Sequence, residues 1–195
     1  MSPRSIPKRG AILYGAAALG AAFLSASSAH AGDADCLWRR LSVASQEDAM
    51  SRMQASGIDG LRQWKPTPVE ASQMAAICVT SGGDLRSASR ALYDFLAETF
   101  LARSFSDRFG ISGNLGDDLW SALPPAQRAE FRRAVMDHSQ GKPRDGTEER
   151  ILAATLNRPY FAMASRPPEQ RAEIVKTIAA YCVFRARREA DESRF

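Results

Sequence analysis

The stretch from Asp84 to Ser104, DLRSASRALYDFLAETFLARS, decides the fold. Its apolar and weakly polar side chains recur at intervals of three and four residues, which places them on one face of an α-helix. The recurring residues are Leu85, Ala88, Leu92, Phe95, Leu96, Thr99 and Phe100. The repeat therefore predicts one long helix that presents an apolar face to a core.

A second helix is predicted directly before this stretch, from Thr67 to about Thr80. Thr67 has the side chain of an N-cap, Pro68 suits the first helical position, and Glu70 is placed to bond back to the cap. The helix should stop at Ser81-Gly82-Gly83, because glycine adopts the backbone conformations that helix ends require.

The segment after the long helix is looser and then becomes helical again. Residues 106–118 contain glycines at intervals of three and are predicted to form a connector. Beyond it, helices are predicted from Pro124 to about Met136, from Thr147 over a short distance, and from Pro167 to about Arg188. No run alternates apolar and polar residues convincingly enough to predict a strand. The sequence thus predicts an all-α fold, a bundle of about six helices.

Two pairs of short segments resemble each other in the same order along the chain. Leu37-Trp38-x-x-Leu41 corresponds to Leu119-Trp120-x-x-Leu123, and AAICV at 75–79 corresponds to AAYCV at 179–183. One interpretation is a single domain over 32–195 built from two related halves, 36–105 and 117–190, the second enlarged. The alternative is that helix starts rich in alanine and arginine have similar short motifs because of their composition, without a common origin.

Residues 1–31 have the three parts of a cleavable signal peptide. A basic start is followed by an apolar stretch from Ala11 to about Ser25 and by Ala29-His30-Ala31, a small-x-small cleavage site. The apolar stretch is shorter than the roughly 20 residues that a membrane span needs. We therefore expect a protein that is periplasmic or secreted and has no integral membrane anchor after cleavage.

The predicted cleavage changes the charge of the protein. Three of the 26 basic residues lie in the signal and no acidic residue does, which leaves 23 basic against 22 acidic residues, a net charge of +1. A nearly neutral protein gives no electrostatic reason to bind polyanions. Nucleic acid is therefore not an expected partner.

Three cysteines remain after cleavage, in a compartment where disulfides persist. The sequence favours a bridge between Cys36 and Cys78, which would contribute about 4 kcal/mol by chain-entropy arithmetic. Cys36 to Cys182 and Cys78 to Cys182 are the alternative pairings. A leftover Cys182 is expected to be a buried, small apolar side chain.

The predicted mature chain has few of the side chains that enzymes commonly use for catalysis. Its one histidine is His138, and no spacing of histidines or cysteines matches a metal site, so no metal or cofactor is expected. Acidic residues are plentiful, but sequence alone does not bring two of them to one cleft. A basic cluster near the end of the chain is interrupted by Glu189, Asp191 and Glu192 and is predicted to form a solvated helix end; it consists of Arg185, Arg187, Arg188 and Arg194.

The aromatic residues give the one candidate binding feature. Five of them stand beside prolines or at predicted helix entrances and could line a groove: Trp38, Trp64, Trp120, Tyr160 and Phe161. The alternative is that they fasten helix ends to the core.

The function class that the sequence favours is a non-catalytic factor that binds another protein, such as an adaptor, an inhibitor or a chaperone-like protein. Second comes a carrier with an aromatic-lined pocket between helices. Third comes an enzyme built from carboxylates and arginines, against which the poverty of catalytic side chains argues. The oligomeric state is left open.

Overall fold

A computed structural model describes residues 32–111, 115–157 and 161–195. These residues form helices and no strand, which confirms the predicted all-α class. The α-helices are α1 (Ala34–Arg39), α2 (Val43–Ser56), α3 (Pro68–Cys78), α4 (Leu85–Phe109), α5 (Pro125–Ser139), α6 (Thr147–Leu156) and α7 (Pro168–Glu192). Three short helical turns accompany them: η1 (Gly57–Leu61), η2 (Gly116–Ser121) and η4 (Met163–Ser165). Residues 1–31, which hold the predicted signal peptide, lie outside the described part.

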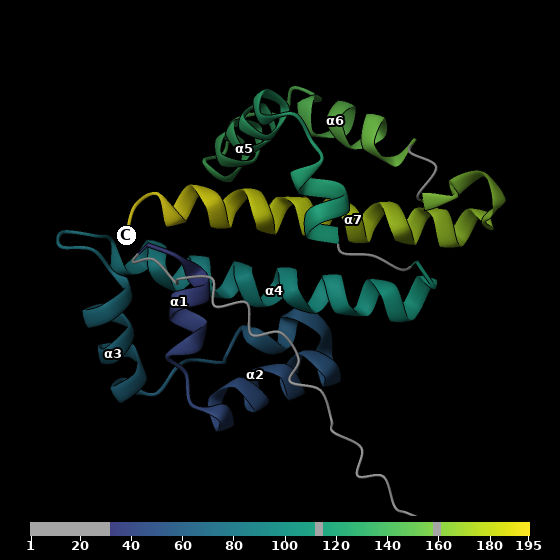
Figure 1. Cartoon of the computed structure of the whole chain (residues 1–195). Helices are drawn as coiled ribbons and strands as arrows, with labels where there is room; N and C mark the ends of the chain where they lie inside the picture. Colours follow the sequence, from purple (N-terminus) through teal and green to yellow (C-terminus); the bar gives the residue numbers. More distant parts are fainter. Residues whose placement is uncertain (1–31, 112–114, 158–160) are drawn as a thin grey trace, which may run out of the picture.

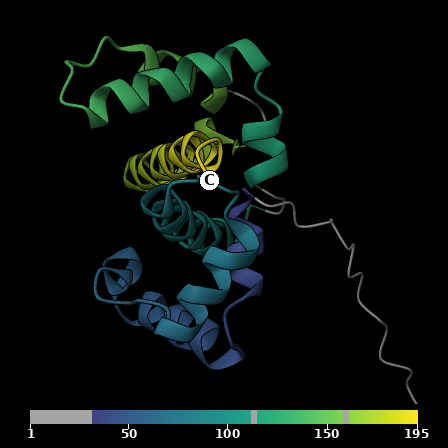
Figure 2. The same cartoon turned by 90° about the vertical axis from the view of Figure 1, so that its left-hand side faces the viewer.

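The two longest helices, α4 and α7, form the centre of the bundle. They lie side by side and antiparallel, with α1, α2 and α3 packed on the side of α4 and with α5 and α6 on the side of α7 (Figure 1). The perpendicular view shows the same order of tiers, with α7 above α4 (Figure 2). The stretch that predicts the long helix therefore lies at the middle of the molecule.

The apolar core consists of two clusters, and α4 contributes to both of them. The first cluster packs α1, α2 and α3 on the N-terminal part of α4, and its fully buried members include Met53, Leu61 and Leu96. The second packs α5, α6 and η2 on α7 and the C-terminal part of α4, around Trp120 and Phe131. The boundary between the clusters does not coincide with that between the predicted halves, because α4 contributes to both clusters, and the common origin of the halves stays a prediction.

Helix α3 begins where its cap predicts. The Thr67 hydroxyl oxygen accepts a hydrogen bond from the Glu70 backbone N–H at 3.3 Å, and the Glu70 carboxylate accepts one from the Thr67 N–H at 2.8 Å. This reciprocal pair is a capping box. The helix ends at Cys78, two residues before the predicted end.

Helix α4 runs five residues beyond its predicted end. Phe105 and Phe109 continue its apolar face into the second cluster, so the helix stops at Phe109, where Gly110 adopts a left-handed conformation with φ of 61°. The expectation of a connector over residues 106–118 is therefore wrong at both ends, because α4 and η2 occupy part of it.

Helix α7 also exceeds its prediction, ending at Glu192 instead of Arg188. The added turn carries Asp191, which is buried and pairs with Arg90 of α4 at 2.7 Å. After it, the chain brings Phe195 into the first core cluster, where the Asp84 N–H donates to the Arg194 carbonyl at 2.8 Å. A side chain at Gly83 would collide with the backbone of Phe195, whose Cα would lie 2.8 Å away.

A disulfide joins Cys36 of α1 to Cys78 of α3, with the sulfur atoms 2.01 Å apart. This is the pairing that the sequence favours. Cys182 is a free thiol, and it is buried in the second cluster. Of the helices in the described ranges, none is long and apolar enough to cross a membrane.

Candidate functional site

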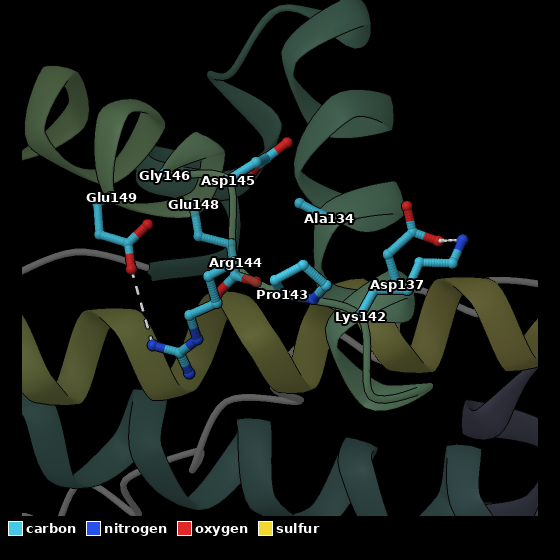
Figure 3. Close-up of a pocket in the computed structure, with 9 residues that line it drawn as sticks. All are labelled: Ala134, Asp137, Lys142, Pro143, Arg144, Asp145, Gly146, Glu148 and Glu149. Carbon is cyan, nitrogen blue, oxygen red and sulfur yellow. Dashed lines mark hydrogen bonds and ion pairs between the residues drawn. The ribbon is translucent and has the colours of Figure 1, made fainter.

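The loop between α5 and α6 forms a small polar pocket of about 220 Å³ (Figure 3). Its charged side chains are paired across the loop: the Lys142 ammonium lies 2.7 Å from Asp137, and the Arg144 guanidinium lies 3.7 Å from Glu149. Asp145 accepts a hydrogen bond from the Thr147 N–H at 2.9 Å, at the start of α6. These contacts shape the loop.

His138 stands beside this pocket, at the end of α5. It is exposed, and its Nε2 lies 3.4 Å from the Arg144 Nε, which donates to it. Among the described residues, no group of three or more histidine, cysteine or acidic side chains could hold a metal ion.

A larger and mostly apolar groove of about 500 Å³ lies between α3 and α4, and we call it the α3–α4 groove. Its wall is formed by residues of α3, α4, η1 and the segment that joins η1 to α3, together with Leu37 of α1. The large apolar and aromatic side chains on this wall include Leu61, Trp64, Met74, Val79, Leu92 and Tyr93. It is an interhelical cavity with aromatic rings on its wall, the general form of a small-molecule site.

Local structure positions the groove. The Trp64 N–H donates to the Leu61 carbonyl at 3.1 Å, which turns the chain after η1 and sets the indole at the groove. Leu37 and Val79, which also line it, directly follow the two bridged cysteines. The disulfide thus fixes the distance between α1 and α3 at one end of the cavity.

The charged side chains that line the groove are cationic. Arg62 and Lys65 line it on the η1 side. The Arg62 Nε lies 2.9 Å from Asp59, whereas Lys65 has no ion-pair partner in the part of the chain that the structure describes. Burial raises the pKa of Tyr93, and so does Asp94, while the nearby Arg187 and Arg62 act in the opposite direction.

The structure places the five aromatic residues that were predicted to line a groove in different environments. Trp64 lines the α3–α4 groove, and the half-buried Trp38 packs against Phe95 with ring centroids 6.4 Å apart. Trp120 and Phe161 are fully buried in the second cluster, so they belong to the core and not to a groove. Tyr160 lies outside the described residues.

The second ring of the groove, Tyr93, was missed by sequence reasoning. It lies within the predicted long helix but outside its three- and four-residue repeat, so nothing local distinguishes it. Its partner is distant in sequence: the Tyr93 ring packs against Phe184 of α7, with centroids 6.3 Å apart. The available signal was an aromatic side chain beside the core face of a central helix.

No family model, curated protein or solved structure matches this chain. The features of the molecule that bear on its function are the groove and the buried charges.

The most perturbed acid is Asp94 of α4, which is completely buried. Burial raises its pKa to about 7, although the neighbouring Arg187 lowers it. The Arg187 Nη2 lies 2.9 Å from one Asp94 oxygen, yet neither oxygen accepts a well-directed hydrogen bond. Asp94 lines neither the polar pocket nor the α3–α4 groove, so it is placed in the α4–α7 interface and not in a substrate cleft.

The same interface contains a second buried acid, Glu98. Its carboxylate accepts hydrogen bonds from Arg185 at 2.7 Å, from Arg188 at 2.9 Å and from the Tyr181 hydroxyl at 3.2 Å. The Arg188 side chain is only 8% exposed. The prediction that these arginines form a solvated helix end is therefore wrong, because Arg185 and Arg188 tie α7 to α4.

Proposed function

We propose that this protein is an exported, non-catalytic carrier of a small amphipathic molecule, held in the α3–α4 groove. The observation that carries the proposal is a preformed apolar cavity of about 500 Å³ with Trp64 and Tyr93 on its wall. Small-molecule sites typically have volumes of about 300–1,000 Å³, an apolar and aromatic lining, and a few polar groups that orient the ligand.

The charges at the groove indicate the chemistry of the ligand. Lys65 supplies positive charge that no ion pair in the described ranges offsets, and Arg62 adds N–H donors beside it. Carboxylates and phosphates accept from such donors. The ligand that fits is an apolar body with one anionic group at the η1 side.

A protein-binding factor has less support. The large apolar side chains most exposed among the described residues are Val43, Val69, Ile77, Leu85 and Val175, which lie on four different helices. Of these, only Leu85 lines the α3–α4 groove. A protein interface is usually built around a clustered apolar centre.

Export is part of the proposal. The support is the signal-like sequence of residues 1–31 and the Cys36–Cys78 disulfide, which is the kind of bond that persists in oxidising compartments.

The test is calorimetric titration of the purified protein, residues 32–195, with sodium dodecanoate. Ala75 lines the groove and the neighbouring Ala76 is exposed and does not, so Ala75→Trp should fill the cavity while Ala76→Trp is a matched control. We expect dodecanoate to bind the wild type and Ala76→Trp equally, and Ala75→Trp at least about tenfold more weakly.

Chain length gives an independent readout. Because each buried methylene contributes about 0.8 kcal/mol, decanoate should bind about tenfold more weakly than dodecanoate. Absence of wild-type binding to dodecanoate and to dodecanol, or equal affinities of Ala75→Trp and Ala76→Trp, would overturn the carrier.

A further inference from the structure

A second apolar groove lies on the other side of the α4–α7 pair, between α6 and α7, and we call it the α6–α7 groove. Its volume is also about 500 Å³. The apolar part of the wall consists mainly of Leu152 and Leu156 of α6 and Val175, Ala179, Val183 and Phe184 of α7. The charged side chains of Arg144, Glu148 and Glu149 also line it, away from Phe184 in sequence. Val175 is 38% exposed, so apolar surface faces solvent here.

The two grooves meet at one pair of rings. Tyr93 lines the α3–α4 groove and Phe184 lines the α6–α7 groove, and their ring centroids lie 6.3 Å apart. They belong to the adjacent central helices α4 and α7. The linings of the two grooves are therefore in contact at this ring pair.

Cations flank the junction. The Arg187 guanidinium carbon lies 5.5 Å from the centre of the Phe184 ring, and Arg62, on the η1 side of the α3–α4 groove, lies near enough to lower the pKa of Tyr93. Each arginine already pairs with one aspartate, Arg187 with Asp94 and Arg62 with Asp59. A guanidinium has five N–H donors in a planar fork, so one carboxylate leaves donors for a further anion.

We infer that the ligand is an anionic lipid with two acyl chains, one in each groove, and with its headgroup at the Tyr93–Phe184 junction between the cations. The inference rests on the proposed carrier function for the α3–α4 groove and adds the second groove and the headgroup position. A ligand with one chain would leave one of two adjoining apolar grooves in contact with water, at the usual cost of exposed apolar area.

Matched variants distinguish the contributions of the two grooves to ligand binding. Ala153 lines the α6–α7 groove, and the adjacent Ala154 is exposed and lines neither groove. Ala153→Trp and Ala154→Trp thus form a pair equivalent to Ala75→Trp and Ala76→Trp. All four variants change α3 or α6 positions outside the buried core, and their circular dichroism spectra report whether each one folds.

The probes are short-chain lipids, titrated calorimetrically as monomers. They are dihexanoyl phosphatidylglycerol, its single-chain lyso form, and dihexanoyl phosphatidylcholine, which has a zwitterionic headgroup. We expect the two-chain anionic lipid to bind the wild type at least about tenfold more tightly than either of the others. Ala153→Trp should remove that advantage over the lyso lipid, whereas Ala154→Trp should keep it.

The outcomes distinguish the inference from the function on which it rests. Equal two-chain affinity in Ala153→Trp and Ala154→Trp, with loss only in Ala75→Trp, would overturn the second groove and leave the carrier intact. Equal binding of phosphatidylcholine would overturn the anionic headgroup. Binding of an amphipathic leucine–lysine peptide but of no lipid would overturn both the inference and the carrier, and would assign the grooves to a protein partner.

Discussion

Glu70 shows how much one carboxylate can organise. Its oxygens accept hydrogen bonds from the backbone N–H of Ser42 at 2.7 Å and of Thr67 at 2.8 Å, and Ser42 and Thr67 are the N-caps of α2 and α3. The Ser45 hydroxyl donates to it as well, at 3.0 Å. One buried side chain therefore satisfies donors at the starts of two helices.

Replacement of Glu70 by glutamine should destabilise the protein at pH 7 by about 1–2 kcal/mol. Burial alone would raise the pKa of Glu70, but the hydrogen bonds from Ser42 and Thr67 lower it to about 2. Because the folded pKa lies below the unfolded value of 4.5, its stabilisation is present above pH 4.5 and is lost as the pH falls towards 2.

Urea unfolding of the wild type and Glu70→Gln between pH 2 and 7 measures this difference. The exposed Glu47→Gln is the control and should show no comparable gap. A wild-type advantage that stays constant down to pH 2 would contradict the assignment.

Asp94 should have the opposite pH dependence. Its folded pKa of about 7 lies above the unfolded value of 3.8, because burial disfavours the charged form. The folded state therefore holds a proton that the unfolded state has lost, and this residue's contribution to stability falls as the pH rises from about 4 to 7. Asp94→Asn should remove the fall, gaining roughly 2–4 kcal/mol relative to the wild type over that range.

The measurement is denaturant unfolding of both proteins at several pH values from 4 to 8. Nuclear magnetic resonance of the Asp94 carboxyl carbon reports the pKa directly. A midpoint near 4 in the folded protein would contradict the prediction.

Residues whose partners are local could be predicted from the sequence, and those with distant partners could not. Thr67 and Glu70 are three positions apart, so the capping box was predictable. Asp94 and Glu98 meet arginines that lie about ninety positions away. A charged residue on α7 looks solvated in sequence, because nothing local shows that α4 supplies its counter-ion.

At the scale of elements, hydrophobic periodicity predicted the positions of the helices better than their ends. The repeat in α4 is local and strong, and it was sufficient to place the central helix. The end of α7 was missed because its last turns are held by buried ion pairs with α4 and not by apolar side chains. Hydrophobic periodicity does not detect such ion pairs between helices, because their side chains are polar.

The ion pair of Glu98 with Arg188 should be strongly coupled. Either Glu98→Leu or Arg188→Met alone leaves a buried charge without its main partner and should cost about 3–5 kcal/mol. The double variant should cost less than the sum of the two, because it removes both charges together.

A double-mutant cycle from chemical denaturation measures that coupling. The exposed pair Asp48–Arg52 on α2 is the matched control, and its coupling should not exceed about 0.5 kcal/mol. Additive effects of Glu98→Leu and Arg188→Met would show that the two side chains are not coupled.

In the whole molecule, α4 and α7 join two apolar clusters into one structure. Each cluster also receives residues from far along the chain: Phe195 is buried in the first cluster, which otherwise ends at Leu96. Both clusters therefore depend on α7 and the residues that follow it. We expect the described part to unfold in a single cooperative transition.

Phe195→Ala should lower stability by about 3 kcal/mol and shift the whole transition. Far-ultraviolet circular dichroism and tryptophan fluorescence should give the same midpoint, because Trp38 and Trp64 pack against the first cluster and Trp120 is in the second. Ser193→Ala, at an exposed position, is the control. Separate midpoints for the two probes would show that the clusters unfold independently.

The candidate site is a property of the assembled molecule, and this limited its prediction. Trp64 was identified from its place near a proline, but the α3–α4 groove also needs α1 to hold both α3 and α4, and it needs Tyr93 of α4 on its wall. Contacts between helices that are distant in sequence leave no periodic pattern in the sequence. Individual residues such as Trp64 could therefore be predicted, but the groove that they form could not.

The disulfide has a consequence for the order of events during synthesis. A chain that emerges N-terminus first exposes Cys36 and Cys78 before Cys182, and the observed bridge joins the first two thiols to appear. Pairing of consecutive cysteines gives the native bond without later reshuffling. Oxidation of these two thiols can then close α1 onto α3 before Cys182 emerges, and no incorrect pairing has to be isomerised to reach the native bond.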